Sequence, residues 1–251
     1  MSRPIDPVPE PSHGRVFASS RRIRLGDVSP KGRLRLDATA RYLQDIANDD
    51  AVDGGYSDIH GWVVRRTDMW VHQFPKYMDN VDLRTWCGGY GSHWAERRTR
   101  IVSTSGAVIE TAALWVHVDL QTLRSTPLPP DFLPIVDMAS GGRRVSAKLT
   151  IGKHLPPPSE KSATVWPWPV RFTDMDAVGH LNNASYWIAL EEYLSRHGSR
   201  RAPLHATVEH HLSIDPGNSV RIFEDTFDDR IILRHVLDND AVAAVTQLIS
   251  L

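Results

Sequence analysis

Hydrophobic and polar residues follow two different periods along the chain, and the same change of period occurs twice. From Leu36 to Asn48, apolar residues recur every three to four positions, as on a helix with one buried face. Segments between residues 62 and 120 are instead rich in Val, Ile, Thr and Trp, which favour strands. A second helical pattern begins at Ala184 and ends before Gly198, and strand-like segments follow it. The pattern therefore predicts an α+β protein made of two similar units.

Proline-rich stretches indicate where these units begin and end. Residues 1–14 contain four prolines and are expected to form a disordered or loosely docked tail. The first unit is predicted to span 15–140, a linker with three consecutive prolines 141–163, and the second unit 164–251. A lone antiparallel sheet leaves an open edge and an exposed face, which a second unit in the same chain can cover. We expect the units to pack face to face as a pseudo-dimer, giving a monomer or a homodimer.

Composition narrows the functional classes. The formal net charge of −1 shows no basic excess, so nucleic acid is not an expected partner. No apolar run reaches the length of about 18 residues that indicates a membrane span. Residues 1–13 lack the apolar core of a secretory signal. Cys87 is the single cysteine, which excludes an internal disulfide and agrees with a reducing cytoplasm.

Chemistry-bearing residues are concentrated in the loop before the second helical pattern. This loop carries Asp174 and Asp176, then Gly179 and His180, and it reaches the helix through Asn182–Asn183. Either asparagine can cap the free N–H groups of the first helical turn with its side-chain oxygen. The loop therefore brings acids and a histidine to the positive end of a helix, where a negative charge on a bound group is favoured.

The same residues resemble a known family signature. The order Asp-x-Asp-x-x-Gly-His-x-Asn-Asn-x-x-Tyr is similar to that of hotdog-fold thioesterases, in which an antiparallel sheet curls around a central helix. The wider context, from about Phe17 to Val220, resembles the acyl-acyl-carrier-protein (acyl-ACP) thioesterases of plants and bacteria, which carry two hotdogs in one chain. The resemblance implies a cytoplasmic thioester hydrolase that needs no metal or other cofactor and acts on acyl-ACP or acyl-CoA.

Each polar residue of the loop has an implied catalytic role and a simpler structural one. Asp176 would activate water or attack the thioester itself, or it would only form a turn. The backbone N–H of Gly179 or of His180 would hold the developing oxyanion, or Gly179 would only permit a tight turn. His180 would polarise the carbonyl or hold the water, or it would only brace the loop. Asp174 is expected to be structural. Because the first unit lacks this loop sequence, we expect one active site per chain.

Two positions depart from the plant-type pattern. Where that family has an asparagine, this chain has Val178, whose side chain can neither donate nor accept a hydrogen bond. The family's downstream glutamate falls on about Ser213 or Ile214, and Asp215 is the nearest carboxylate able to replace it. Three functions stay open: acyl-ACP hydrolysis, acyl-CoA hydrolysis and non-catalytic sensing of acyl thioesters. A hotdog hydratase fits less well, because Val178 and Gly179 stand where hydratases have Asn-Pro.

Two further groups of residues are candidates for binding. Three tryptophans are candidates to line an acyl pocket, although most tryptophans simply lie in cores: Trp62, Trp70 and Trp115. Clustered arginines are candidates for a patch that receives an acidic carrier protein or CoA phosphates, or they are only solvated strand edges and loops. These are Arg65, Arg66, Arg97, Arg98, Arg100, Arg143 and Arg144.

Overall fold

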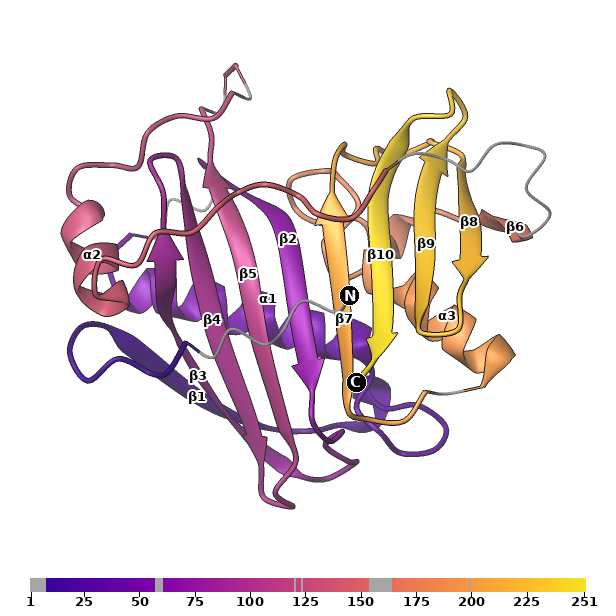
Figure 1. The fold of residues 1–251 in the computed structure, drawn as a ribbon, viewed down its shortest axis with the longest axis horizontal. Coiled ribbons are helices and arrows are strands. Elements are labelled where there is room, and N and C mark those ends of the chain that lie inside the picture. The colour runs from indigo at the N-terminus through magenta and orange to yellow at the C-terminus, as the bar shows by residue number, and fades with distance from the viewer. Residues whose placement is uncertain (1–7, 57–60, 120, 123, 154–163, 199) are drawn as a thin grey trace.

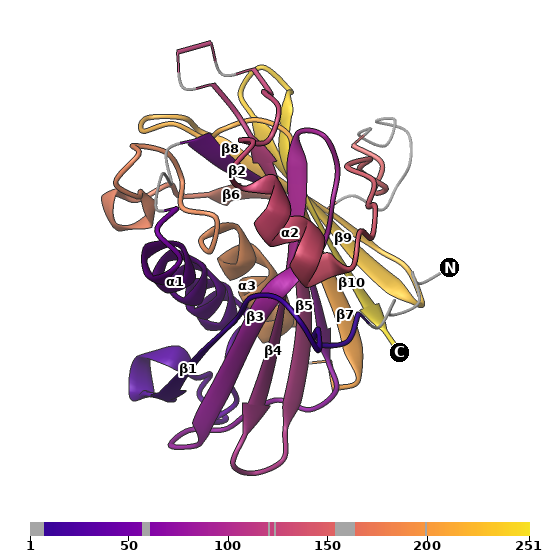
Figure 2. The same cartoon turned by 90° about the vertical axis from the view of Figure 1, so that its left-hand side faces the viewer.

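The computed structural model describes residues 8–56, 61–119, 121–122, 124–153, 164–198 and 200–251. Ten antiparallel strands form a single sheet in the order β1-β3-β4-β5-β2-β7-β10-β9-β8-β6 (Figure 1). Two long helices, α1 and α3, lie on one face of this sheet, which we call the inner face (Figure 2). The opposite face is called the outer face.

The elements fall into two halves with similar order. The first half contains β1 (Val16–Arg22), the single-turn helix η1 (Leu25–Asp27), α1 (Leu36–Asp53), β2 (Trp62–Val71), β3 (Asn80–Tyr90), β4 (Trp94–Ser103), β5 (Val108–His117) and α2 (Leu133–Ser140). The second half contains β6 (Thr164–Trp168), the single-turn helix η3 (Phe172–Asp174), α3 (Tyr186–His197), β7 (Leu204–His210), β8 (Val220–Thr226), β9 (Arg230–Leu237) and β10 (Val242–Ser250).

Each half curls its five strands around its own helix, which confirms the expected α+β double hotdog. The predicted apolar stripe of α1 is buried in the core, namely Leu36, Ala40, Leu43, Ile46 and Ala47. Helix α3 buries Tyr186, Trp187, Leu190, Tyr193 and Leu194 in the same way. It begins two residues later than the sequence pattern indicates and ends at Gly198, as predicted.

The two halves join side by side, not face to face as the sequence predicted. Strand β2 pairs with β7 in a register that runs from Arg66↔Glu209 to Val71↔Leu204, so the sheet continues without a break. The backbone N–H and C=O groups at the open edge of each half therefore find partners in the other half, which stacking would not provide. Because both helices lie on the inner face, α1 and α3 also pack against each other (Figure 2).

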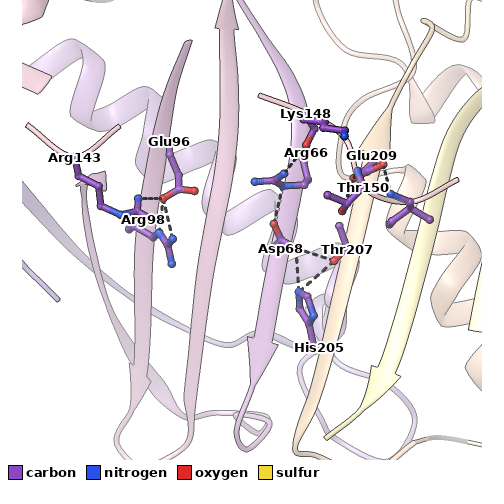
Figure 3. Close-up of polar contacts among 11 residues, drawn as sticks. Arg66, Asp68, Glu96, Arg98, Arg143, Lys148, Thr150, His205, Thr207 and Glu209 are labelled. Atoms are coloured by element: carbon purple, nitrogen blue, oxygen red, sulfur yellow. Dashed lines mark hydrogen bonds and ion pairs between the residues drawn. The ribbon is translucent and has the colours of Figure 1, made fainter. Parts of the chain in front are cut away.

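A buried polar cluster reinforces this seam on the outer face (Figure 3). Asp68 on β2 accepts hydrogen bonds from Thr207 at 2.8 Å and from Nε2 of His205 at 2.9 Å, both on β7. Arg66 donates to the other oxygen of Asp68 at 2.9 Å. Burial alone would raise the pKa of Asp68, but the His205 bond and the Arg66 charge together hold that pKa below its usual value. Trp70 stacks on the His205 ring, with centroids 4.7 Å apart.

The described part of the predicted linker, residues 141–153, crosses the outer face (Figure 1). The backbone N–H groups of Thr150 and Ile151 donate to the Glu209 carboxylate at 2.7 and 3.1 Å. Burial raises the pKa of Glu209, although these two bonds act in the opposite direction. The linker is thus fastened to β7. Residues 154–163, with the three prolines, lie outside the described residues, and the unit boundaries stay a prediction.

The predicted N-terminal tail is described only in part. Residues 1–7 lie outside the described residues, but Glu10 pairs with Arg84 on β3. The described part of the tail is therefore docked on the first half through this pair. Among the described residues, no helix is long and apolar enough to cross a membrane.

Replacing Asp68 with asparagine should destabilise the protein most at neutral pH, because Arg66 would then be buried without its anionic partner. We expect the free energy of unfolding to fall by about 3–5 kcal/mol at pH 7 in urea denaturation. The folded-state pKa of Asp68 lies below its ordinary 3.8. Its stabilisation is therefore present above about pH 4 and is lost as the pH falls through the folded pKa. The difference between wild type and variant should shrink toward about pH 3.

Asp82→Asn, an exposed carboxylate on β3, is the control for this experiment. It should change the free energy of unfolding by less than about 0.5 kcal/mol throughout the pH series. A loss in Asp68→Asn that stays constant across the series would show that Asp68 provides shape and hydrogen bonding, and not charge.

Candidate functional site

The loop that precedes α3 is held at its base by hydrogen bonds. In η3, the buried Asp174 carboxylate accepts the backbone N–H that starts the turn, at 2.9 Å. The Asp174 carbonyl accepts the N–H of Asn182 at 2.8 Å, and the N–H of Leu181 donates to the Ile214 carbonyl at 2.8 Å. The loop is therefore tied both to itself and to the segment after β7. Asp174 has the structural role expected for it.

The tip of the loop is a tight turn around Asp176. Its carbonyl accepts the N–H of Gly179, and its N–H donates to the His180 carbonyl, both at 3.0 Å. Gly179 has a φ of 88°, a left-handed conformation that glycine adopts without strain. One carboxylate oxygen of Asp176 accepts the N–H of Val178 at 2.9 Å. This turn fixes the carboxylate, and its second oxygen makes no hydrogen bond within the described part of the chain.

His180 and Asp215 form a hydrogen-bonded pair. Nδ1 of His180 lies 2.8 Å from a carboxylate oxygen of Asp215, and both side chains are about half exposed. Because a carboxylate only accepts, Nδ1 carries the proton, and Nε2 of the neutral ring keeps a free lone pair. Asp215, the carboxylate nearest to the position of the family's glutamate, is thus bonded to His180. Its neighbour Ile214 is fully buried.

Tyr186 lies beside both carboxylates of the loop region. Its ring packs edge-on against His210 and His235, at centroid distances of 4.7 and 5.2 Å. Burial raises the pKa of Tyr186, and the charges of Asp215 and Asp176 raise it further. Burial lowers the pKa of both histidines to about 3, so they are neutral at physiological pH. Tyr186, His210 and His235 are therefore all uncharged at physiological pH.

Of the two backbone donors expected for the oxyanion, Gly179 and His180, one is already bonded. The N–H of Gly179 is taken up by the turn and is not free to hold an oxyanion. The N–H groups of His180 and Asn183 make no hydrogen bond with the residues that the structure describes. Asn182 caps the turn into α3 by accepting the N–H of Ala184 at 2.8 Å. The unoccupied donor at the entrance to α3 is therefore that of Asn183, where the helix end favours negative charge.

A channel leads from this end of α3 into the first half. Its narrow part is lined by Asn183 and Ala184 on one side and by Gln44 of α1 on the other. It adjoins a larger cavity of about 240 Å³ beside the C-terminal part of α1, because Gln44, Arg97 and Trp115 line both spaces. The cavity walls are mainly apolar and suit a hydrocarbon chain; they include Ala47, Ala51, Trp62, Trp86, Trp115, Phe132, Val136 and Ala139.

The tryptophan predictions are confirmed in part. Trp62 and Trp115 line the cavity, but Trp70 lies on the outer face against His205. Trp86 also lines the cavity, and the sequence gave no sign of this. Its place depends on α2, which packs against β3 and closes this end of the cavity.

Most of the candidate arginines contact other groups of the same chain. Five of them pair with acids, which offsets the cost of burying charge where the side chain is buried. The pairs are Arg66 with Asp68, Arg97 with Asp50, Arg100 with Glu110, and both Arg98 and Arg143 with Glu96. A sixth, Arg144, lies over the ring of Tyr90.

Neither a reactive thiol nor a cluster of metal ligands is present in the described part of the chain. Cys87 lines the large cavity, but burial raises the pKa of its thiol to about 11, so it is not a thiolate at neutral pH. No group of three or more His, Cys, Asp or Glu side chains is placed to hold a metal ion among these residues.

Comparison with known sequences identifies the family. Residues 14–136 match the family model of the acyl-ACP thioesterase N-terminal domain, and residues 158–249 match that of the C-terminal domain. An uncharacterised protein of Mycobacterium tuberculosis is 28% identical over 239 residues, or 94% of this chain and 93% of the relative. The chloroplastic dodecanoyl-acyl-carrier-protein hydrolase of Umbellularia californica is 25% identical over 194 residues, or 70% of this chain and 50% of the relative. The chain thus spans about half the length of that plant relative.

Solved structures share the fold over nearly the whole chain. A putative oleoyl thioesterase from Lactobacillus plantarum has a TM-score of 0.77 at 18% identity, covering 96% of this chain and 98% of the other. The 12:0-ACP thioesterase from Umbellularia californica has a TM-score of 0.75 at 18% identity, covering 93% and 96%. With the double hotdog shared and both domain models matched in one chain, the protein belongs to the acyl-ACP thioesterase family.

Proposed function

We propose that the protein hydrolyses acyl-ACP thioesters and releases free fatty acids. One arrangement supports this function above all: Asp176 and His180, with Asp215 bonded to His180, lie on or beside the loop whose end, Asn183, lines the channel. The channel suits the acyl chain, and the polar loop suits the thioester at its end. Membership of the family and the plant relative, which is an acyl-ACP hydrolase by name, point to the same reaction.

In the proposed mechanism, a water molecule attacks the thioester carbonyl carbon. Asp176 accepts a proton from this water through its free carboxylate oxygen. His180 positions the water through Nε2, and Asp215 fixes the orientation and tautomer of the ring. The N–H of Asn183 holds the oxyanion; a preorganised donor of this kind contributes about 3 kcal/mol. Collapse of the intermediate breaks the C–S bond, and the proton on Asp176 passes to the departing thiolate. The alternative is direct attack by the Asp176 carboxylate on the carbonyl carbon, which breaks the C–S bond, expels the thiolate and forms a mixed anhydride; water then hydrolyses the anhydride to the fatty acid and the Asp176 carboxylate, and the released proton goes to the thiolate.

An acyl-CoA thioesterase and a non-catalytic acyl sensor are the alternative functions. The exposed Val178 and the buried Ile214 both lack the polar side chains of the plant-type pattern, which favours a sensor. The hydrogen bond of Asp215 to His180 favours an enzyme. Turnover of matched acyl-ACP and acyl-CoA thioesters separates the three. Faster hydrolysis of acyl-ACP supports the main proposal, faster hydrolysis of acyl-CoA the second, and binding without turnover the third.

We further propose a cytoplasmic protein that acts as a pseudo-dimer. The single cysteine suits a reducing compartment. Strand β2 of the first half pairs with β7 of the second half within one chain. A monomer therefore already has the arrangement that a separate hotdog would reach by dimerising. A homodimer would have to use other surfaces, such as the terminal strands β1 and β6.

Asp176→Asn should nearly abolish hydrolysis, because an amide cannot accept the proton of the attacking water. We expect kcat with acyl-ACP to fall by about 10²–10⁴ in a free-thiol assay, with thermal unfolding unchanged. Asp119→Asn is the matched control, since Asp119 also accepts a backbone N–H in an exposed turn, from Thr122 at 2.8 Å. Its kcat should stay within about twofold of wild type. Full activity of a folded Asp176→Asn would remove Asp176 from the mechanism.

Asp215→Asn should lower kcat by about 10²-fold or more, because an amide would no longer fix the tautomer that leaves Nε2 of His180 free. Steady-state kinetics with acyl-ACP would measure this. Asp240→Asn, which removes an exposed ion pair with Arg221, is the control and should leave kcat unchanged. If Asp215→Asn keeps the wild-type kcat, Asp215 does not position the histidine during the reaction.

Ala47→Phe should shift the preference toward shorter acyl chains. Ala47 is buried in the wall of the large cavity, and the ring would fill space that the end of a long chain needs. Each methylene kept out of the cavity forfeits about 0.8 kcal/mol, or roughly fourfold in kcat/KM. The ratio of kcat/KM for hexadecanoyl-ACP to that for octanoyl-ACP should fall by more than about tenfold. Ala241→Phe, just before β10, is the control. An unchanged ratio in Ala47→Phe would show that the acyl chain lies elsewhere.

A further inference from the structure

The loops that precede α1 and α3 repeat each other residue by residue. In each, the carboxylate that ends the single-turn helix accepts the N–H of the residue three positions earlier, at 2.9 Å. Each loop then closes through an isolated β-bridge and contains a glycine of positive φ. Matching residues are 147 positions apart in the sequence. The matched pairs are Asp27 and Asp174, Val28 and Met175, Gly32 and Gly179, and Leu34 and Leu181.

In the first half, the carboxylate of Glu191 from the second half binds the end of the loop that precedes α1. Glu191 extends from α3 and accepts the N–H of Leu36, at the start of α1, at 2.7 Å. The same carboxylate accepts two bonds from the Arg33 guanidinium, at 2.9 and 2.7 Å. Its side chain is only 10% exposed. The donors of the first loop are therefore satisfied by the chain itself, and substrate cannot reach them without breaking these bonds.

The same spacing of 147 relates the partners of this contact to the catalytic loop. Arg33 corresponds to His180, Leu36 to Asn183, and Glu191 to Gln44. The N–H of Asn183 makes no hydrogen bond with the described residues, unlike that of Leu36. The half-buried Gln44 lines the narrow channel together with Asn183, and within the described part of the chain its amide has no hydrogen-bond partner either. The second loop thus leaves unbonded, at a residue that lines the channel, the N–H that the first loop donates to Glu191.

We propose that Gln44, supplied by the N-terminal half, is a catalytic residue that binds the thioester carbonyl oxygen. This assignment rests on the proposed thioesterase function. The oxygen lies between the Gln44 amide N–H and the backbone N–H of Asn183, as an oxygen of Glu191 lies against Leu36 in the first half. The active site is therefore shared between the halves, with the loop from one and an oxyanion donor from the other.

The difference between glutamine and glutamate explains why only one of the two loops is open. A carboxylate at position 44 would be expected to bind the Asn183 N–H itself, as Glu191 binds that of Leu36. It would also repel the negative charge that develops on the carbonyl oxygen. An amide has the same shape, carries no charge and offers two N–H donors. Gln44 therefore leaves room for the oxyanion and adds a donor to it.

Kinetics of Gln44 variants test this assignment. Gln44→Leu should lower kcat with acyl-ACP by about 10²-fold with little change in KM, because the lost bond strengthens mainly in the transition state. Gln44→Glu, which keeps the shape of the side chain, should be at least as impaired. Gln247→Leu and Gln247→Glu are the controls, because Gln247 is a half-buried glutamine on β10, outside the channel. Wild-type kcat in a folded Gln44→Leu or Gln44→Glu would overturn the proposal; if Gln44→Leu fails to fold, Gln44→Glu carries the test.

A binding experiment keeps this proposal separate from the proposed function. If the wild type hydrolyses no thioester, the proposed function fails, but ligand placement can still be measured by calorimetry. Dodecanoate and its neutral methyl ester are titrated into the wild type and Gln44→Glu. A glutamate beside the ligand oxygens should raise the Kd for dodecanoate by more than about tenfold and the Kd for the ester by less than about threefold, since only dodecanoate is charged. Equal effects on both ligands, or no binding of either by the wild type, would overturn the assignment.

Discussion

The pairing of β2 with β7 is the constraint on which the rest of the structure depends. It joins two curled sheets at the edges that each would otherwise leave open, and so fixes how the halves sit relative to each other. With this register set, α1 and α3 lie on the same face and touch (Figure 2). Each helix can then reach the loop of the other half, which is how Glu191 arrives at Arg33 and Leu36. A face-to-face arrangement would not bring these groups together.

On the outer face, the seam between β2 and β7 is lined by buried ionisable side chains. Asp68, Arg66 and Glu209 are ionisable groups that the fold buries, and each has at least one hydrogen-bond partner from a distant segment. Asp68 receives its hydrogen bonds from β7, and Glu209 receives its bonds from the linker that crosses the sheet. Burying such groups is unfavourable unless their partners are correctly placed. The cluster therefore favours one register of the seam over others.

The two halves illustrate how one local structure can serve two purposes. The loops before α1 and α3 share their turn, bridge and glycine, but they end differently. In the first, an arginine and a glutamate close the loop with an ion pair between the halves. In the second, His180 pairs with Asp215, and the N–H of Asn183 faces the channel beside Gln44. The loop before α1 thus stabilises the contact between the halves, and the equivalent loop before α3 carries the proposed catalytic groups.

The sequence by itself determined the features that depend on near neighbours. The buried stripe of α1, the repeated order of helix and strands, the turn made by Asp174 and the left-handed Gly179 all follow from helical period or from turn chemistry within a few residues. Tertiary structure alone decided the side-by-side seam, the outer position of Trp70, the acids that take up the arginines, and the meeting of His180 with Asp215 and of Asn183 with Gln44. These contacts join distant segments; at the seam, Asp68 and Thr207 are 139 residues apart in the sequence. Strand register and sheet edges set them, and no local pattern of apolar and polar residues encodes which edge a strand will find.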